Sequence, residues 1–204
     1  MNVSTTDNTS ALGKRDVILE AANKVFLEVG FGAASMDTIA NAAQVSKQTV
    51  YNHFGSKEEL FAAMVRASCD NMTLAFAEAA KDGNPEKALH AIARHFMGVV
   101  FSPEKLAMHR ILMAEVPRFP ELGRVYYQSG PAIIRKFLAD YFMEQNKRGT
   151  LKVENPRLTA EQFINMVTCC RLRSDLGVEP VPSQDIREQY IHNAVALIMH
   201  ACKA

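Results

Sequence analysis

The sequence predicts an all-α protein of about nine or ten helices, in which three short N-terminal helices are joined to a larger helical region. Apolar residues recur at three- and four-residue spacing, and the alternation typical of strands is almost absent. Capping residues followed by Pro or Glu mark several helix starts. In residues 45–61, a short helix, a tight break at Gly55 and a second helix capped by Ser56 indicate the end of a helix-turn-helix.

The first two predicted helices supply part of one small core. Residues 15–29 carry an apolar stripe that ends at Gly30, and the stripe consists of Ile18, Ala21, Ala22, Val25 and Phe26. Ser35 can cap the second helix, over residues 36–43. Its expected buried side consists of Ile39, Ala40 and Ala43. We therefore expect both helices to pack against the third.

The third predicted helix, residues 47–54 capped by Ser46, has a polar face opposite its buried side. With roughly 100° of rotation per residue, the apolar pair Val50 and Phe54 faces the core. The side chains that point away from the core or flank that face are Gln48, Thr49, Tyr51, Asn52 and His53. Amide, hydroxyl, phenol and imidazole groups suit base edges and phosphates. Taken alone, Tyr51 would also fit a half-buried aromatic residue, and His53 would fit an ordinary surface histidine. Only the whole set indicates a DNA-reading face.

Residues 15–61 resemble the DNA-binding domain of the TetR/AcrR family of bacterial transcriptional regulators. The shared pattern runs in order through IL-x-AA from Ile18, Phe26, GF from Gly30, SM-x-x-IA from Ser35, Ala43, VS from Val45 and TVY-x-HF-x-SKEELF from Thr49. The resemblance implies a recognition helix over residues 47–53, phosphate contacts from Tyr51, His53 and Lys57, and support from Thr38. The predicted DNA-binding residues are Lys14, Arg15, Thr38, Ser46, Lys47, Gln48, Thr49, Tyr51, Asn52, His53 and Lys57.

Charge limits how this region can bind DNA. The formal net charge of the 204-residue chain is only +1. Residues 14–66 hold Lys14, Arg15, Lys24, Lys47, Lys57 and Arg66 against Asp16, Glu20, Glu28, Asp37, Glu58 and Glu59, so the segment has no basic excess. We therefore expect specific contacts and a local basic cluster, rather than indiscriminate coating of DNA.

The rest of the chain predicts further helices. The expected spans are residues 57–80, 85–100, 103–116, 121–147, 160–173 and 184–202. Gly130 and Pro131 should kink or split the fourth of these, and Thr159 should begin the fifth. The expected organisation is a disordered tail over residues 1–13, a helix-turn-helix DNA-binding domain over 14–60, and a helical effector-binding and dimerisation domain over 61–204.

The last two predicted helices carry broad apolar stripes. The resemblance implies that they pair with their copies in a homodimer, whereas the alternative is a monomeric core. The predicted dimer-interface residues are Phe163, Val167, Cys170, Tyr190, Ala194, Leu197 and Ile198. A dimer could place two recognition helices about 34–36 Å apart, on successive major grooves of palindromic operator DNA.

The middle helices are rich in aromatic and methionine side chains. Most of these fit a core, but the resemblance implies a small, hydrophobic effector whose binding releases a repressor from DNA. The predicted effector-pocket residues are His95, Phe96, Phe101, His109, Met113, Tyr126, Tyr127, Phe137, Phe163, Met166 and Arg171. For the polar members, the alternative is a surface position or a satisfied core position.

Other classes of function have weaker support. A helical enzyme or a helical interaction module is the alternative, but no phosphate loop, nucleophile motif or metal-ligand spacing is present. We therefore expect no catalytic residues, metal or cofactor. The four cysteines lack paired metal spacing and predict reduced thiols, and the absence of an apolar spanning segment or signal peptide predicts a cytoplasmic protein, nucleoid-associated when bound to DNA.

Overall fold

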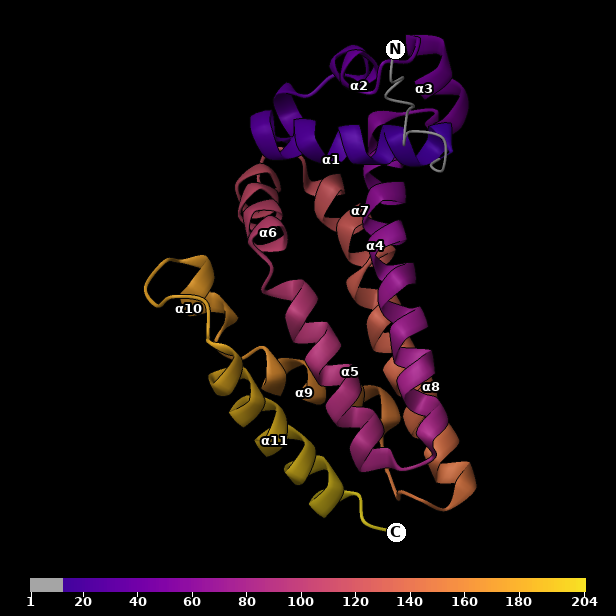
Figure 1. The fold of residues 1–204 in the computed structure, drawn as a ribbon, viewed down its shortest axis with the longest axis vertical. Coiled ribbons are helices and arrows are strands. Elements are labelled where there is room, and N and C mark those ends of the chain that lie inside the picture. Colours follow the sequence, from indigo (N-terminus) through magenta and orange to yellow (C-terminus); the bar gives the residue numbers. More distant parts are fainter. Residues whose placement is uncertain (1–12) are drawn as a thin grey trace, which may run out of the picture.

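The computed structural model describes residues 13–204 and confirms the all-α prediction (Figure 1). The elements are α1 (Lys14–Ala33), α2 (Met36–Ala42), α3 (Lys47–Phe54), α4 (Lys57–Ala79), a 3-10 turn η1 (Ala80–Asp82), α5 (Pro85–Val100), α6 (Pro103–Glu115), α7 (Pro120–Ser129), α8 (Pro131–Arg148), α9 (Pro156–Val167), α10 (Arg171–Asp175) and α11 (Gln184–Ala201). None of these helices has the length and apolar character needed to cross a bilayer. Apart from Gly13, the predicted tail lies outside the described residues.

The predicted caps of the N-terminal helices are confirmed. The side chains of Ser35, Ser46 and Ser56 each accept a hydrogen bond from the backbone N–H three residues later, at 3.0, 3.1 and 3.1 Å. Gly55 ends α3 with a φ of 72°, and Gly30 interrupts α1 with a φ of 78° before one more turn. Local chemistry therefore sets the boundaries of the helix-turn-helix.

The predicted break at Gly130 and Pro131 is confirmed, because residues 120–148 form two helices, α7 and α8, separated at Gly130. The next predicted helix differs from the structure. Helix α9 begins at Pro156, because Asn155 caps it by accepting from the Leu158 N–H at 3.1 Å, and Thr159 lies inside it. It ends at Val167, and α10 follows as a separate helix. With these breaks, the described residues 13–204 form eleven α-helices.

Two hydrophobic clusters organise the molecule. The first joins α1–α3 and the start of α4 to Met108 and Leu112 of α6 and Leu122 of α7. The second is formed mainly by α5, α8, α9 and α11. Helix α4 contributes to both, so the predicted boundary between residues 60 and 61 falls inside one continuous helix. Figure 1 shows α1 lying across the ends of α4, α6 and α7. The N-terminal unit, which consists of α1–α3 and the start of α4, therefore packs directly on α6 and α7.

Candidate nucleic-acid interface and effector cavity

Helix α3 has the predicted orientation. Val50 and Phe54 are buried in the N-terminal cluster. The exposed residues of the opposite surface are Lys47, Gln48, Tyr51, Asn52 and His53, whereas Thr49 is half-buried. Tyr51 leaves 40% of its surface exposed, a high value for a tyrosine in a helix that packs on a core. The structure therefore presents this polar set to solvent on one short helix.

Hydrogen bonds order this polar surface. The Gln48 amide donates to the Asn52 side-chain oxygen at 2.7 Å, which aligns two amides that can read base edges. The Ser46 and Thr49 hydroxyls lie 2.8 Å apart, as do those of Ser35 and Thr38. These hydroxyls therefore also support the helix starts.

The basic side chains around α3 have different partners. Lys47 pairs with Asp37 at 2.9 Å and lies 5.9 Å from the centre of the Tyr51 ring. Its hydrogen bond to Asp37 raises the pKa of the Lys47 ammonium. Arg15 lies over the Phe54 ring at 5.5 Å, and Lys14 is exposed at the start of α1. This basic cluster thus lies beside the polar surface of α3.

Lys57, which is predicted to contact a phosphate, lies against the end of α1 in this structure. Its ammonium donates to the carbonyl oxygens of Phe31 and Ala34 at 2.7 and 2.9 Å and lies 4.4 Å from the centre of the Phe31 ring. Burial lowers the pKa of this ammonium. In this structure Lys57 therefore closes the end of α1 with two of its three N–H donors, and its predicted phosphate contact stays a prediction.

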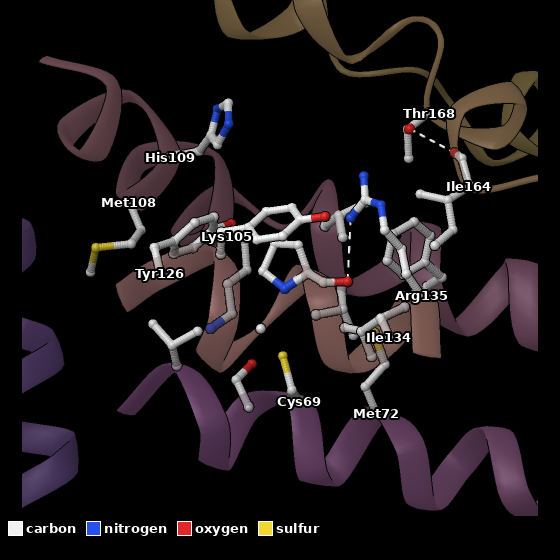
Figure 2. Close-up of a pocket in the computed structure, with 18 of the residues that line it drawn as sticks. Cys69, Met72, Lys105, Met108, His109, Tyr126, Ile134, Arg135, Ile164 and Thr168 are labelled. Atoms are coloured by element: carbon white, nitrogen blue, oxygen red, sulfur yellow. Dashed lines mark hydrogen bonds between the residues drawn. The ribbon is translucent and has the colours of Figure 1, made fainter. Parts of the chain in front are cut away.

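A cavity of about 280 Å³ lies beneath the N-terminal unit, and Figure 2 shows residues of α4, α6 and α8 around it. The predicted pocket residues that line it are Phe96, His109, Tyr126, Tyr127 and Arg171. Further lining residues include Met64, Val65, Cys69, Met72, Lys105, Met108, Ile134, Arg135 and Thr168. The wall is thus largely apolar, with basic groups and phenols at a few positions.

Several predicted pocket residues do not line this cavity. Phe101 and Phe163 are buried in the larger hydrophobic cluster, and Met113 is 60% exposed to solvent. Phe137 and His95 lie against Phe76, and Met166 packs on the same cluster. Their side chains lie on the core side or the solvent side of their helices, so this part of the prediction is wrong for the cavity in this structure.

The lining residues that the sequence analysis missed come mainly from α4 and α8. Gly130 is the feature of the sequence that could have indicated these residues. It separates α7 from α8, and the chain passes close to α4 at this point. A Cβ atom at Gly130 would lie 2.9 Å from the Val65 side chain and 3.3 Å from the sulfur of Cys69. The helix break at residues 130–131 therefore marks a close approach beside the cavity.

Charged groups at one end of the cavity connect α6 to α10. Asp175 lies 2.9 Å from Nδ1 of His109, without the alignment of a hydrogen bond, and 3.4 Å from Nε of Arg171. Arg110 donates to the backbone carbonyls of Ser174 and Asp175, both at 2.9 Å. Helix α10 is therefore held against α6 at the cavity wall.

Acid pH should weaken the packing around His109. Burial, followed by the charge of Arg171, lowers the pKa of His109, although Asp175 opposes the shift. The unfolded chain binds this proton more readily, so the stabilising contribution of a neutral His109 is lost as pH falls below the unfolded value of about 6.5. We expect His109→Gln to reduce the loss of unfolding free energy between pH 7.5 and pH 5.5, measured by urea denaturation. The exposed His200→Gln is the control, and an equal pH dependence in both variants would contradict the prediction.

The predicted dimer interface is mostly internal. Phe163, Val167, Cys170, Ala194 and Ile198 are buried within one chain, because α11 packs on α5 and α9. Tyr190 is half-buried and Leu197 is 60% exposed. Other large apolar residues exposed on α9–α11 and the segments beside them are Leu158, Leu172, Leu176, Val178, Val181 and Ile186. The buried five are therefore core residues, and any pairing surface must use the exposed ones.

The described residues contain no group of three or more His, Cys, Asp or Glu side chains that could hold a metal ion. The four cysteines are free thiols, of which Cys169 is exposed. Burial raises the pKa of the thiols of Cys69, Cys170 and Cys202. A buried thiol with a raised pKa is a poor nucleophile.

A helix-turn-helix head seated on a helical body with an internal cavity defines a ligand-responsive type of DNA-binding regulator. Residues 18–64 match the family described as bacterial regulatory proteins, tetR family, and residues 87–203 match AefR-like transcriptional repressor, C-terminal domain. The chain belongs to the TetR family and is a DNA-binding transcriptional regulator. The family and the similar proteins are regulators and not enzymes.

Two similar structures cover more than nine-tenths of the chain, and one similar protein covers less than a third of it. The flavonoid-responsive regulator FrrA is 34% identical, with a TM-score of 0.71 over 93% of this chain and 97% of FrrA. A TetR-family regulator from Mesorhizobium loti MAFF303099 is 26% identical, with a TM-score of 0.79 over 94% and 97% of the two chains. The transcriptional activator FasR of Mycolicibacterium smegmatis is 46% identical over 59 residues, which are 29% of this chain and only 27% of FasR.

Proposed function

We propose that this regulator is a repressor that binds a palindromic operator as a homodimer and leaves it when a small, largely apolar effector enters the cavity. One observation carries the proposal: α6 contributes both to the cavity and to the core of the DNA-binding head. Met108 and His109 line the cavity, and Leu112, one turn later, packs in the head. A ligand that moves α6 can therefore move the head.

The names of the similar proteins support two parts of this proposal. Residues 87–203 match a repressor domain, which favours repression, whereas the match to the activator FasR covers only 29% of this chain. FrrA is named for its response to flavonoids, which supports a small-molecule effector. The alternatives of an enzyme or an interaction module would leave the exposed polar surface of α3 without a role.

We assign DNA binding to residues 14–60, and effector binding and dimerisation to residues 61–204. In this assignment Gln48, Thr49 and Asn52 read bases, and Tyr51 and His53 contact phosphates together with the basic cluster of Lys14, Arg15 and Lys47. Ser46 and Thr38 position the helices. The exposed apolar residues of α9–α11, including Leu197, pair with a second copy. Such a pair could place two α3 helices about 34–36 Å apart, on successive major grooves.

Selection of binding sites from random duplex DNA tests the proposal. The purified protein is used at near-physiological salt, because phosphate contacts make affinity strongly salt-dependent. The Tyr51→Ala variant is run in parallel. We expect the parent alone to enrich a palindrome. Enrichment of a single half-site would contradict the homodimer, and equal enrichment by both proteins would contradict the role of α3.

Substitutions on α3 should separate base reading from phosphate binding. Gln48→Ala should cost about 1–3 kcal/mol of binding free energy at one base pair and relax the preference there. Tyr51→Ala should weaken binding to all sequences alike. Fluorescence anisotropy with the enriched operator and its single-base variants measures both effects. Gln162→Ala, at an exposed glutamine of α9, is the control, and unchanged base preference in Gln48→Ala would contradict the assignment.

A further inference from the structure

The charged side chains that line the cavity are all basic. They are Lys105, Arg135 and Arg171, with His109 beside them, and the lining contains no Asp or Glu. Asp175 lies behind the wall and pairs with Arg171 and His109. The cavity therefore has an excess of positive charge on a largely apolar wall.

Arg135 and Lys105 differ in how their charges are compensated. Arg135 lies over the Tyr127 ring at 5.7 Å, donates to the Pro131 carbonyl at 3.3 Å and has a carboxylate oxygen of Glu161 at 3.9 Å. Lys105 has no carboxylate within 4.0 Å of its ammonium among residues 13–204, and no described group accepts a hydrogen bond from it. Lys105 is thus the lining cation without a protein partner in the described chain.

Lys105 is well placed to meet a ligand. It lies in the first turn of α6, where its backbone N–H donates to the Ser102 hydroxyl at 3.3 Å. Figure 2 shows its side chain extending from α6 toward Cys69 of α4. Its positive charge acts against the increase that burial causes in the pKa of the Cys69 thiol. The Lys105 residue is half-buried, and an anionic ligand group would supply its ammonium with a partner.

The apolar lining residues and the volume of the cavity indicate what the uncharged part of the ligand is. Phe96 and Tyr126 offer aromatic rings to the cavity, and Met72 and Ile134 offer aliphatic surface. The volume of about 280 Å³ is just below the roughly 300–1,000 Å³ typical of small-molecule sites, which favours a small ligand. Taking the proposed effector cavity as given, we propose that its ligand is an aromatic organic acid, whose carboxylate or ionised phenol pairs with Lys105.

Ligands of similar shape but different charge test whether the cavity prefers an anion. The probes are naphthoate, its neutral methyl ester and the cationic naphthylmethylamine, measured by isothermal titration calorimetry. We expect the acid to bind at least about tenfold more tightly than the ester, and the amine to bind least. A second pair, dinitrophenol and its neutral methyl ether dinitroanisole, distinguishes an ionised phenol from a carboxylate.

Substitution of Lys105 tests the assigned partner. We expect Lys105→Met to weaken binding of the preferred acid about 10- to 100-fold, to leave its neutral counterpart unchanged and to keep the parent's melting temperature. Lys105→Arg should restore most of the affinity. Lys136→Met removes an exposed lysine that pairs with Asp140, and should have no effect.

Each outcome has a defined meaning. Equal binding of acids and neutral counterparts would overturn the anion inference and leave the effector cavity in place. Unchanged acid binding by a folded Lys105→Met variant would overturn the role of Lys105. Binding of none of the probes by the parent would overturn the cavity as a site for aromatic effectors, and the anion inference with it.

Discussion

Phe26→Ala should lower the free energy of unfolding by about 3–5 kcal/mol, the range for removing a fully buried phenylalanine. Phe26 has no exposed surface, and its ring centre lies 5.6 Å from those of Phe31 and Phe61. Phe31 in turn lies 5.8 Å from Phe119, which precedes α7. These rings join the DNA-binding head to the body, so the cavity left by the substitution would loosen both.

Urea denaturation followed by circular dichroism measures the effect, and Phe26→Leu is the matched control. Leucine keeps most of the buried volume but loses the aromatic contacts, so a loss below about 1.5 kcal/mol is expected. If Phe26→Ala cost less than Phe26→Leu, the head would not depend on this cluster. Operator affinity should fall in step with the folded fraction of Phe26→Ala.

Much of the fold could be predicted because its signals are local. At the start of α2, α3 and α4, a serine hydroxyl accepts a hydrogen bond from the backbone N–H three residues later. This contact lies within one turn, so it fixes each helix start without reference to the rest of the chain. The orientation of α3 follows from the spacing of Val50 and Phe54 alone. The start of α9 was misplaced because two capping signals compete within five residues, and Asn155 with Pro156 is the stronger pair.

The cavity could be predicted only in part, because an apolar stripe indicates burial but not what covers it. Phe96 and Phe163 have the same character in the sequence, yet Phe96 lines the cavity and Phe163 lies in the core. Whether a helix face meets another helix or a space depends on residues far away in the chain. Lys105 and Arg135 were missed for a related reason, since a lysine or arginine on a helix usually belongs to the solvated surface.

The joint between the head and the body depends on closely placed glycines at the end of α1. Gly30 has a φ of 78° and a ψ of 170°, a conformation that is essentially confined to glycine. A Cβ atom there would lie 2.9 Å from a carboxylate oxygen of Glu115, the last residue of α6, and one at Gly32 would lie 3.0 Å from the other oxygen. The charge of Glu115 also acts to raise the pKa of Lys57, which closes the same helix end, although burial outweighs it.

Gly30→Ala should therefore lower the free energy of unfolding by about 1–3 kcal/mol, the cost of holding a residue with a Cβ atom in this backbone conformation. Gly83→Ala is the control, because Gly83 has the same φ of 78° but a ψ of −12° and no atom within 4 Å of an added Cβ. That change should cost only about 1 kcal/mol. Equal losses in urea denaturation would mean that neither the backbone conformation at Gly30 nor the nearby Glu115 side chain resists an added Cβ atom. A larger loss for Gly30→Ala would mean that these two features constrain the end of α1, where it meets the end of α6.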